Sequence, residues 1–137
     1  KVADKLIKND CIFLIGEIGV GKTTFTRYLI NYLQKKNGEK ITEVLSPTFN
    51  LLYEYDLKVI KIMHYDLYRI RDEKELKQLG IFLDKQDTIK IIEWPQLINI
   101  PLSDKLEIHL EYVKNEQERE IKFIGSGKWK TLNELQT

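Results

Sequence analysis

The fold of this chain is decided by the stretch Gly16-Glu17-Ile18-Gly19-Val20-Gly21-Lys22-Thr23, which fits the phosphate-binding loop pattern G-x-x-x-x-G-K-[ST]. Its glycines allow the backbone to curl so that successive N–H groups point inward around phosphates, and a helix that begins there adds the positive end of its dipole. In such a loop Lys22 would reach the β- and γ-phosphates, and the Thr23 hydroxyl would bind Mg²⁺. The stretch therefore predicts a site for the phosphates of a nucleotide.

The sequence on either side of the loop has the pattern that such a site needs. Upstream, Cys11–Ile15 is a continuous apolar run, as expected for a strand buried on both faces of a parallel sheet. Downstream, apolar residues recur at helical spacing over residues 25–33, and Lys35–Gly38 supplies a basic last turn with a stop signal. Because strand, loop and helix follow in the required order, a glycine-rich turn without a ligand is the disfavoured alternative.

Length and charge limit what the chain can do by itself. Its 137 residues predict a single domain over residues 1–137, which is small for a nucleotide enzyme that must also recognise a second substrate. We therefore expect a partner to supply something. Lys and Arg total 22 against 21 Asp and Glu, a net charge of +1. This balance disfavours binding of DNA, or of RNA by this chain alone, because no strong basic field is available.

Cysteine content and hydropathy indicate the compartment. The single cysteine, Cys11, lies inside the predicted strand, which excludes an intrachain disulfide and indicates a reducing setting, so we interpret its thiol as core packing. No apolar stretch approaches the ~18 residues of a membrane span, and no signal-peptide layout is present. We expect a cytoplasmic protein without membrane contact. Numbering starts at Lys1 rather than Met, in a helix-like stretch, so a leading strand could be missing.

Beyond the first helix, patterning predicts a mixed sheet with further helices. Expected strands are 43–45, 51–55, 59–64, 89–92, 106–112 and 120–124, and expected helices are 73–79, a turn at 81–85 and a final helix at about 128–135. The strands 51–55 and 59–64 read as a hairpin, and the last two alternate as an antiparallel pair would. Asp72 and Gly80 would cap the helix 73–79. The fold class is α/β: a P-loop NTPase-like three-layer α/β/α domain with a mixed, mainly parallel sheet and an antiparallel C-terminal strand pair.

Two carboxylates, Asp66 and Glu93, come at the ends of apolar strands. Open α/β sheets bind ligands outside the carboxyl ends of their strands, and Mg²⁺ takes one or two protein oxygens while keeping several waters. Phosphoryl transfer also needs a group that orients the nucleophile. We rank Glu93 first as metal ligand and water-orienting group, and Asp66 as a carboxylate behind the ligands or on the nucleophile side. For each, a solvated loop acid is the alternative.

Four other side chains have a functional and a structural interpretation. Thr48, in the proline-constrained loop after Pro47, could sense the γ-phosphate by joining Mg²⁺ coordination, or could serve as a turn hydroxyl. Arg69 could stabilise charge on the transferred phosphate, or pair with a nearby acid. His64 and Trp94 border the two carboxylates, and a core histidine and a packing tryptophan are their default interpretations.

Four motifs follow one another along the chain. They are the phosphate loop with Thr24 after it, Ser46-Pro47-Thr48-Phe49 followed by Glu54-Tyr55, His64-Tyr65-Asp66-Leu67-Tyr68-Arg69, and Ile92-Glu93-Trp94-Pro95. Many families share the phosphate loop, but the combination with the other motifs is specific. In their order and spacing they resemble the bacterial TsaE (YjeE) family, the ATPase subunits of tRNA threonylcarbamoyladenosine (t6A) synthesis. With the closing strand pair, the resemblance covers nearly the whole chain.

The resemblance implies an ATP-hydrolysing, Mg²⁺-dependent subunit that acts on the TsaD–TsaB complex, which modifies adenosine 37 of tRNA. Such a subunit would not transfer the carbamoyl group itself and would meet tRNA only through the complex. Carried over to this sequence, Lys22, Thr48, Asp66 and Glu93 would be catalytic, and Thr23 and Glu93 would hold Mg²⁺. Contacts to ATP or ADP would come from Gly16, Glu17, Gly19, Val20, Gly21, Lys22, Thr23, Thr24 and Trp94.

Two other classes of P-loop protein remain as alternatives. A small-molecule kinase needs a lid over the phosphates, commonly with several arginines, and the four arginines of this chain do not cluster in a late loop. A GTPase switch would need a guanine-reading [NT]-K-x-D element. The stretch Asp84-Lys85-Gln86-Asp87 begins with Asp and precedes a strand where that element follows one. GTP specificity is therefore disfavoured.

A second stretch, Gly125-Ser126-Gly127-Lys128, only partly matches the phosphate loop. Trp129 stands where Ser or Thr is needed, so we interpret the stretch as a turn before the final helix. The adjacent Lys128-Trp129-Lys130 could contact RNA or a partner protein, or could be a solvated helix start.

Overall fold

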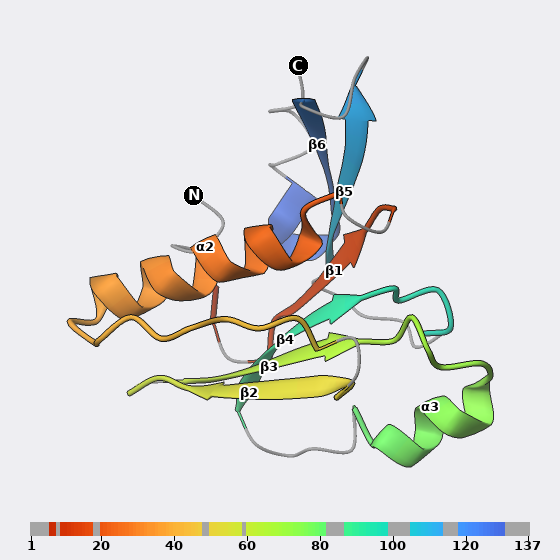
Figure 1. Ribbon diagram of the computed structural model, residues 1–137, viewed down its shortest axis with the longest axis horizontal. Coiled ribbons are helices and arrows are strands. Elements are labelled where there is room, and N and C mark those ends of the chain that lie inside the picture. Colours follow the sequence, from red (N-terminus) through yellow and green to blue (C-terminus); the bar gives the residue numbers. More distant parts are fainter. Residues whose placement is uncertain are drawn as a thin grey trace.

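The computed structural model describes residues 6–7, 9–17, 20–47, 50–58, 60–81, 87–98, 105–113 and 118–130. Within these ranges, six strands form one mixed sheet in the order β2-β3-β4-β1-β5-β6, accompanied by two helices (Figure 1). The strands are β1 (Cys11–Ile15), β2 (Leu52–Asp56), β3 (Lys61–Asp66), β4 (Thr88–Glu93), β5 (Lys105–Val113) and β6 (Glu118–Gly125). The helices are α2 (Lys22–Lys36) and α3 (Glu73–Leu79).

The centre of the sheet is parallel and its two edges are antiparallel. The central strand β1 pairs in parallel with β4 and β5, and β4 pairs in parallel with β3. The edge strand β2 pairs antiparallel with β3, which follows it in the chain. The other edge strand, β6, pairs antiparallel with β5, which precedes it. The predicted mixed, mainly parallel sheet with a C-terminal antiparallel pair is therefore confirmed.

Both faces of the sheet carry a hydrophobic core. Along β1 the side chains alternate, so that Ile12 and Leu14 pack with the apolar residues of α2, whereas Cys11 and Phe13 pack in a second cluster with residues of α3. Figure 1 shows α2 and α3 on opposite sides of the sheet. A strand buried on both faces has no polar face, which explains the continuous apolar run in β1. The predicted three-layer arrangement is confirmed.

The capping residues of α3 have the predicted roles. The Asp72 side chain accepts a hydrogen bond from the Glu75 backbone N–H at 2.9 Å, as an N-cap aspartate does. Gly80 ends the helix in the left-handed conformation, with φ at 61°. Local sequence thus defined this helix, whose bounds agree with the prediction.

The strand predicted at Glu43–Leu45 is wrong. The segment runs back beside α2, with Val44 in the core, but it joins no ladder of the sheet (Figure 1). A side chain accepts from its backbone instead: the Leu45 N–H donates to Tyr55 Oη at 3.2 Å. Just before the segment, the Thr42 N–H donates to Gln34 Oε1 at 3.3 Å. Side-chain partners reached through tertiary packing therefore replaced strand pairing.

The interpretation of Lys128-Trp129-Lys130 as a surface stretch is wrong for its tryptophan. Trp129 is 0% exposed and belongs to the core beneath α2, so its ring is not available to RNA or to a partner. Residues 127–130 form a single 3₁₀ turn, and the rest of the predicted final helix lies outside the described residues. The Lys128 ammonium pairs with Asp10 at 2.6 Å. The stretch Gly125–Lys128, which only partly matches the phosphate loop, therefore covers the end of β6 and the turn after it.

Some predictions fall on residues that are not described. The helical turn at 81–85, apart from Ile81, is among them, and so is most of the Asp84–Asp87 stretch. The helix-like stretch that starts at Lys1 lies largely outside as well. In the part of the chain that the structure describes, no helix combines the length and the apolar character needed to cross a membrane.

Replacing Gly125 with alanine is expected to lower the free energy of unfolding by about 1–3 kcal/mol. A Cβ atom at this position would lie 2.5 Å from Trp129 Cβ and would also overlap the Trp129 backbone, which the core holds in place. Chemical denaturation measures the change. Lys130→Ala, at an exposed residue of the same turn, serves as control and should change stability by no more than about 0.5 kcal/mol. Equal stability of the two variants would contradict the close approach.

The Cys11 thiol should react poorly with thiol reagents in the native protein. Burial raises the pKa of this thiol to about 12, with small opposing effects from Lys90 and Lys105. At pH 8 the native thiol would carry about 1,000-fold less thiolate than an ordinary cysteine, and thiolate is the reactive form. Labelling with a chromogenic disulfide, with and without guanidinium, tests this. The same labelling rate in native and denatured protein would show that Cys11 is not buried.

Candidate functional site

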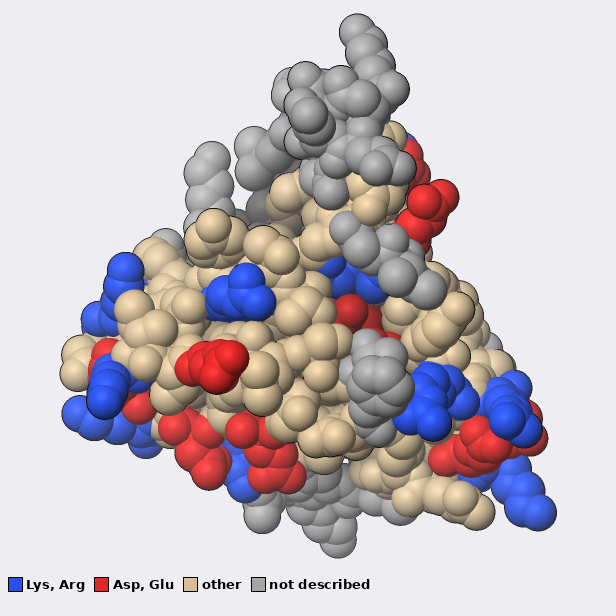
Figure 2. Space-filling model, viewed as in Figure 1, with Lys and Arg blue, Asp and Glu red and all other residues tan. Residues whose placement is uncertain are grey.

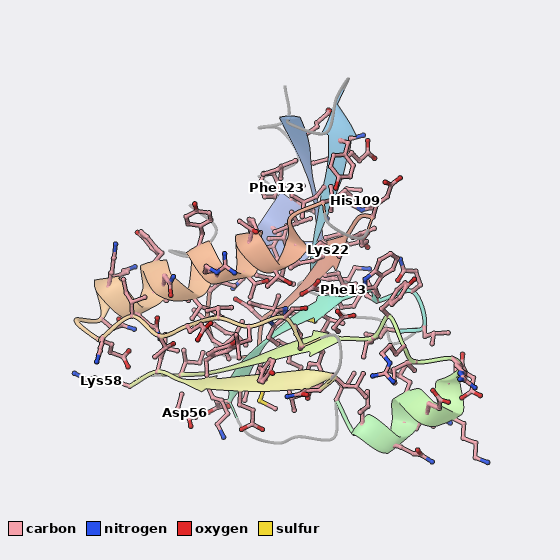
Figure 3. The ribbon with its side chains drawn as sticks, viewed as in Figure 1. Phe13, Lys22, Asp56, Lys58, His109 and Phe123 are labelled. Atoms are coloured by element: carbon pink, nitrogen blue, oxygen red, sulfur yellow. The ribbon has the colours of Figure 1, made fainter. Side chains whose placement is uncertain are left out.

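The residues of the site meet at the carboxyl-terminal ends of the parallel strands β1, β3 and β4. The phosphate loop leaves β1 at Gly16, and α2 begins at Lys22. Asp66 and Glu93 are the last residues of β3 and β4, and they lie opposite each other in the strand register. Figure 3 shows Lys22 at the end of α2 nearest the arrowheads of β1 and β4. This is the position at which open α/β sheets bind ligands.

Lys22 directs its ammonium group into the loop. Its Nζ donates to the Gly16 carbonyl at 2.6 Å and to the Glu17 carbonyl at 2.8 Å, and it lies 4.5 Å from the centroid of the Trp94 ring. The residue is only 5% exposed, and this burial lowers the pKa of Lys22, while the negative charges of Glu93 and Asp66 partly oppose the shift. A cation is thus held beside the loop backbone, where phosphate oxygens could replace the two carbonyls.

Two glycines shape the loop. Gly21, the N-cap of α2, has φ at 111° and provides no side-chain cap, and the first turn of the helix carries no acidic residue. The N–H groups and the positive dipole end at the start of α2 therefore face no competing carboxylate from that turn. A Cβ on Gly16 would lie 2.5 Å from the Leu110 carbonyl oxygen and 2.8 Å from Val20 Cγ1, so β5 and the loop leave room only for glycine. Gly19 lies outside the described residues.

Thr23 and Glu93 come together from α2 and β4. Thr23 Oγ1 donates to Glu93 Oε2 at 3.3 Å, although the two residues are far apart in sequence. A hydroxyl and a carboxylate are the hard oxygen ligands that Mg²⁺ prefers, and Mg²⁺ needs only one or two of them beside phosphate and water. The donor set therefore fits the metal that the phosphate loop implies.

Asp66 is buried at the same end of the sheet. Its Oδ1 accepts a hydrogen bond from the Tyr68 backbone N–H at 2.9 Å, which fixes the turn after β3. Its charge acts on Lys22, because burial lowers the pKa of that ammonium group and Asp66, after Glu93, partly opposes this shift. Asp66 and Glu93 are thus paired acids at one end of the sheet rather than solvated loop residues.

Trp94 has a backbone conformation that the sequence did not indicate. Its φ is 58°, in the left-handed region, although the residue before a proline normally adopts an extended conformation. This geometry carries the ring over Lys22 and against Tyr68, with ring centroids 4.8 Å apart and planes at 50°. Strained residues of this kind cluster at functional sites, and here the strained residue directly follows Glu93.

His64 is the residue whose position sequence reasoning explained least. As expected it is a core histidine, 0% exposed, but its Nε2 also lies 2.6 Å from Glu93 Oε2. Its place two residues before Asp66 on an apolar strand was the only available signal. Tyr68 was likewise missed as a contact of Trp94, and its membership of the same motif was the signal for it.

The other candidate residues differ in how much the structure says of them. Val20 is buried under the loop, whereas Glu17 and Thr24 are exposed beside it. Arg69 is exposed on the turn after β3 and has an interaction with a neighbour. Thr48 lies outside the described residues, although Pro47 before it is buried.

Comparison with known proteins identifies the family to which the sequence is similar. The sequence profile of a family described as "Threonylcarbamoyl adenosine biosynthesis protein TsaE" matches residues 1–121. Proteins named tRNA threonylcarbamoyladenosine biosynthesis protein TsaE are 38% identical in Rickettsia conorii, over 83% of this chain, and 35% identical in Bacillus subtilis, over 86%. This chain spans 63% of the Rickettsia conorii protein and 71% of the Bacillus subtilis protein.

A solved structure has the same fold. The crystal structure of Bacillus subtilis YdiB aligns with a TM-score of 0.67 and 27% sequence identity, and the alignment covers 97% of this chain and 80% of YdiB. The likeness therefore extends over nearly the whole chain. Because the family profile matches residues 1–121 and relatives are 35% to 38% identical over the residues that align, this chain belongs to the TsaE family.

Proposed function

We propose that this chain binds ATP with Mg²⁺ and hydrolyses it as the ATPase subunit of tRNA threonylcarbamoyladenosine modification. One observation supports the proposal most strongly: the Lys22 ammonium, the Thr23 hydroxyl and the Glu93 carboxylate converge where the phosphate loop meets the sheet. These are the groups that phosphoryl transfer requires. The names of its relatives place the family in biosynthesis of this tRNA nucleoside.

Phosphate binding would use the loop backbone, α2 and Lys22. The Lys22 ammonium now donates to the Gly16 and Glu17 carbonyls, and phosphate oxygens are stronger, charged acceptors at the same place. Burial lowers the pKa of Lys22 because the charged form lacks water, so a phosphate anion would restore what desolvation removed. The start of α2 would add N–H donors and the positive end of its dipole.

Hydrolysis would depend on Glu93 and Asp66. Mg²⁺, when bound, would neutralise charge that develops on the β- and γ-phosphates. Thr23 and Glu93 would hold it, and Glu93 would orient the attacking water by accepting its hydrogen bond. Water oxygen forms a bond to the γ-phosphorus as the bond to the ADP oxygen breaks, which releases ADP, inorganic phosphate and a proton. Asp66, opposite Glu93, would add negative charge on the nucleophile side.

The partner of this ATPase would be the TsaD–TsaB complex. Relatives of this chain are named for biosynthesis of this tRNA nucleoside, which suits a subunit that acts together with the enzyme that modifies the tRNA. Transfer of the threonylcarbamoyl group would remain with that complex, in the cytoplasm. Figure 2 shows positive and negative side chains interspersed on the visible face, so tRNA contact through the complex is the simpler expectation.

Phosphate release from ATP and from GTP, with this protein alone and then with TsaD–TsaB, tests the proposal. We expect ATP to be preferred and the partner complex to change the rate. The same rate with and without partners, or equal use of GTP, would contradict the proposal and favour a self-contained kinase or a GTPase-like switch. A kinase would also show phosphate transfer to a small-molecule hydroxyl in place of release.

A further inference from the structure

Glu93 does not stand alone at the end of β4. His64 Nε2 lies 2.6 Å from Glu93 Oε2, and the Thr23 hydroxyl donates to the same oxygen at 3.3 Å. Two side chains therefore contact the same carboxylate oxygen, His64 from β3 and Thr23 from α2. The shorter of the two contacts comes from a side chain that is completely buried.

We propose that His64 is a positioning residue, which holds the Glu93 carboxylate in the orientation needed to bind the metal and to orient water. This inference rests on the proposed ATPase function and adds a residue to it. His64 would touch neither ATP nor the attacking water, and would act only through Glu93. Buried partners of this kind orient the ligand side chains of metal sites and raise their affinity.

The hydrogen-bonding state of the imidazole follows from its surroundings. Among the described residues none hydrogen-bonds to His64 Nδ1, which is buried. A ring that donates from Nε2 to the carboxylate and leaves a lone pair at Nδ1 avoids a buried N–H without an acceptor, the costlier arrangement. The geometry therefore assigns Nε2 as the nitrogen that donates to Glu93.

The sheet places His64 for this role. In the parallel pairing of β3 with β4, His64 lies opposite Ile91 and Asp66 lies opposite Glu93, so the His64 ring must reach one step along the sheet. Ile62 and Ile91, which share its side of the sheet, belong to the hydrophobic core under α2. In such a low-dielectric setting a hydrogen bond to a carboxylate is strong.

His64 would become most important when the metal site is filled. The Thr23 hydroxyl would then turn to Mg²⁺, and His64 would remain to hold Oε2. Without His64, the Glu93 side chain would lose its buried partner and could turn away from the metal position. The carboxylate would then hold the metal less well, while the contacts of Lys22 with the phosphates would not change.

The kinetic test compares His64→Leu with His64→Gln. We expect His64→Leu to lower kcat, or to raise the Mg²⁺ concentration for half-maximal rate, by about 10- to 100-fold, with ATP affinity in the absence of Mg²⁺ unchanged. The glutamine amide can donate where Nε2 does, so His64→Gln should recover most of the loss. Ile62→Val, two residues earlier on the same face, is the matched core control. It should lower Tm but leave the Mg²⁺ dependence unchanged.

A double-mutant cycle tests whether His64 acts through Glu93. The readout is the ratio of the Kd for ATP without and with Mg²⁺, which needs no turnover. If the proposal holds, His64→Leu lowers this ratio in the wild-type background and changes it no further in the Glu93→Gln background. Additive effects in the two backgrounds would overturn the proposal, because they would show that His64 acts elsewhere.

A third measurement needs neither ATP nor metal. Long-range ¹H–¹⁵N spectra of the nucleotide-free protein should show a proton on His64 Nε2. An Nε2 without a proton would overturn the proposal, because the ring could not then donate to Glu93. Failure of the proposed function can be told apart, because the wild-type protein itself would then neither bind nor hydrolyse ATP. If wild-type hydrolysis is normal and His64→Leu matches it in kcat and Mg²⁺ dependence, only the role of His64 is overturned.

Discussion

Replacing Glu93 with glutamine is expected to lower Mg²⁺-dependent ATP hydrolysis by about 100- to 1,000-fold while ATP still binds. Glutamine has the shape of glutamate and can still accept from Thr23 and His64, which both contact Oε2. It lacks the charge that would bind Mg²⁺ and make the side chain a strong acceptor for the attacking water. Phosphate release at saturating ATP measures kcat, and nucleotide titration measures the retained binding.

The control for this variant is Glu111→Gln, because Glu111 is an exposed acid on β5. It removes the same charge from the protein and should leave hydrolysis within about twofold of the wild type, as surface substitutions do. Wild-type hydrolysis by the Glu93 variant would overturn the assignment of Glu93. A loss of ATP binding equal to the loss of rate would instead place Glu93 in ground-state binding of the nucleotide.

Replacing Lys22 with alanine is expected to weaken ATP binding by at least about 100-fold, with or without Mg²⁺. The ammonium group is the buried cation of the loop, and each of its hydrogen bonds to phosphate would be charge-assisted. Alanine also leaves the Gly16 and Glu17 carbonyls without this donor, so the loop loses a contact that orders it. Calorimetry or a fluorescent ATP analogue would measure the affinity.

Lys35→Ala is the matched control for Lys22→Ala. Lys35 is an exposed lysine in the last turn of the same helix, and its removal changes net charge equally. Its ATP affinity should stay within about twofold of the wild type, and both variants should be checked for an unchanged Tm. ATP binding that survives in Lys22→Ala would show that the loop backbone alone holds the phosphates, and Lys22 would lose its assigned role.

Elements of the fold whose signals are local agreed with the structure. The apolar run of β1, the loop and α2 are encoded by neighbouring residues, and α3 begins and ends at its own capping side chain and glycine. The strand predicted at Glu43–Leu45 is wrong, because Leu45 donates its N–H to the Tyr55 hydroxyl and not to a neighbouring strand. Trp129 was misjudged for a similar reason, since its flanking lysines suggested a surface and tertiary packing buried the ring.

The sequence by itself determined the family, the phosphate loop and the two carboxylates at strand ends, because loop geometry and burial depend on residues close in the chain. Only the tertiary structure decided that His64, Thr23 and Glu93 share one oxygen, and that Trp94 turns over Lys22 in a left-handed conformation. These contacts join residues distant in sequence. The register of the strands and the packing position of α2 on the sheet bring these residues together. No local sequence pattern specifies the register or that position.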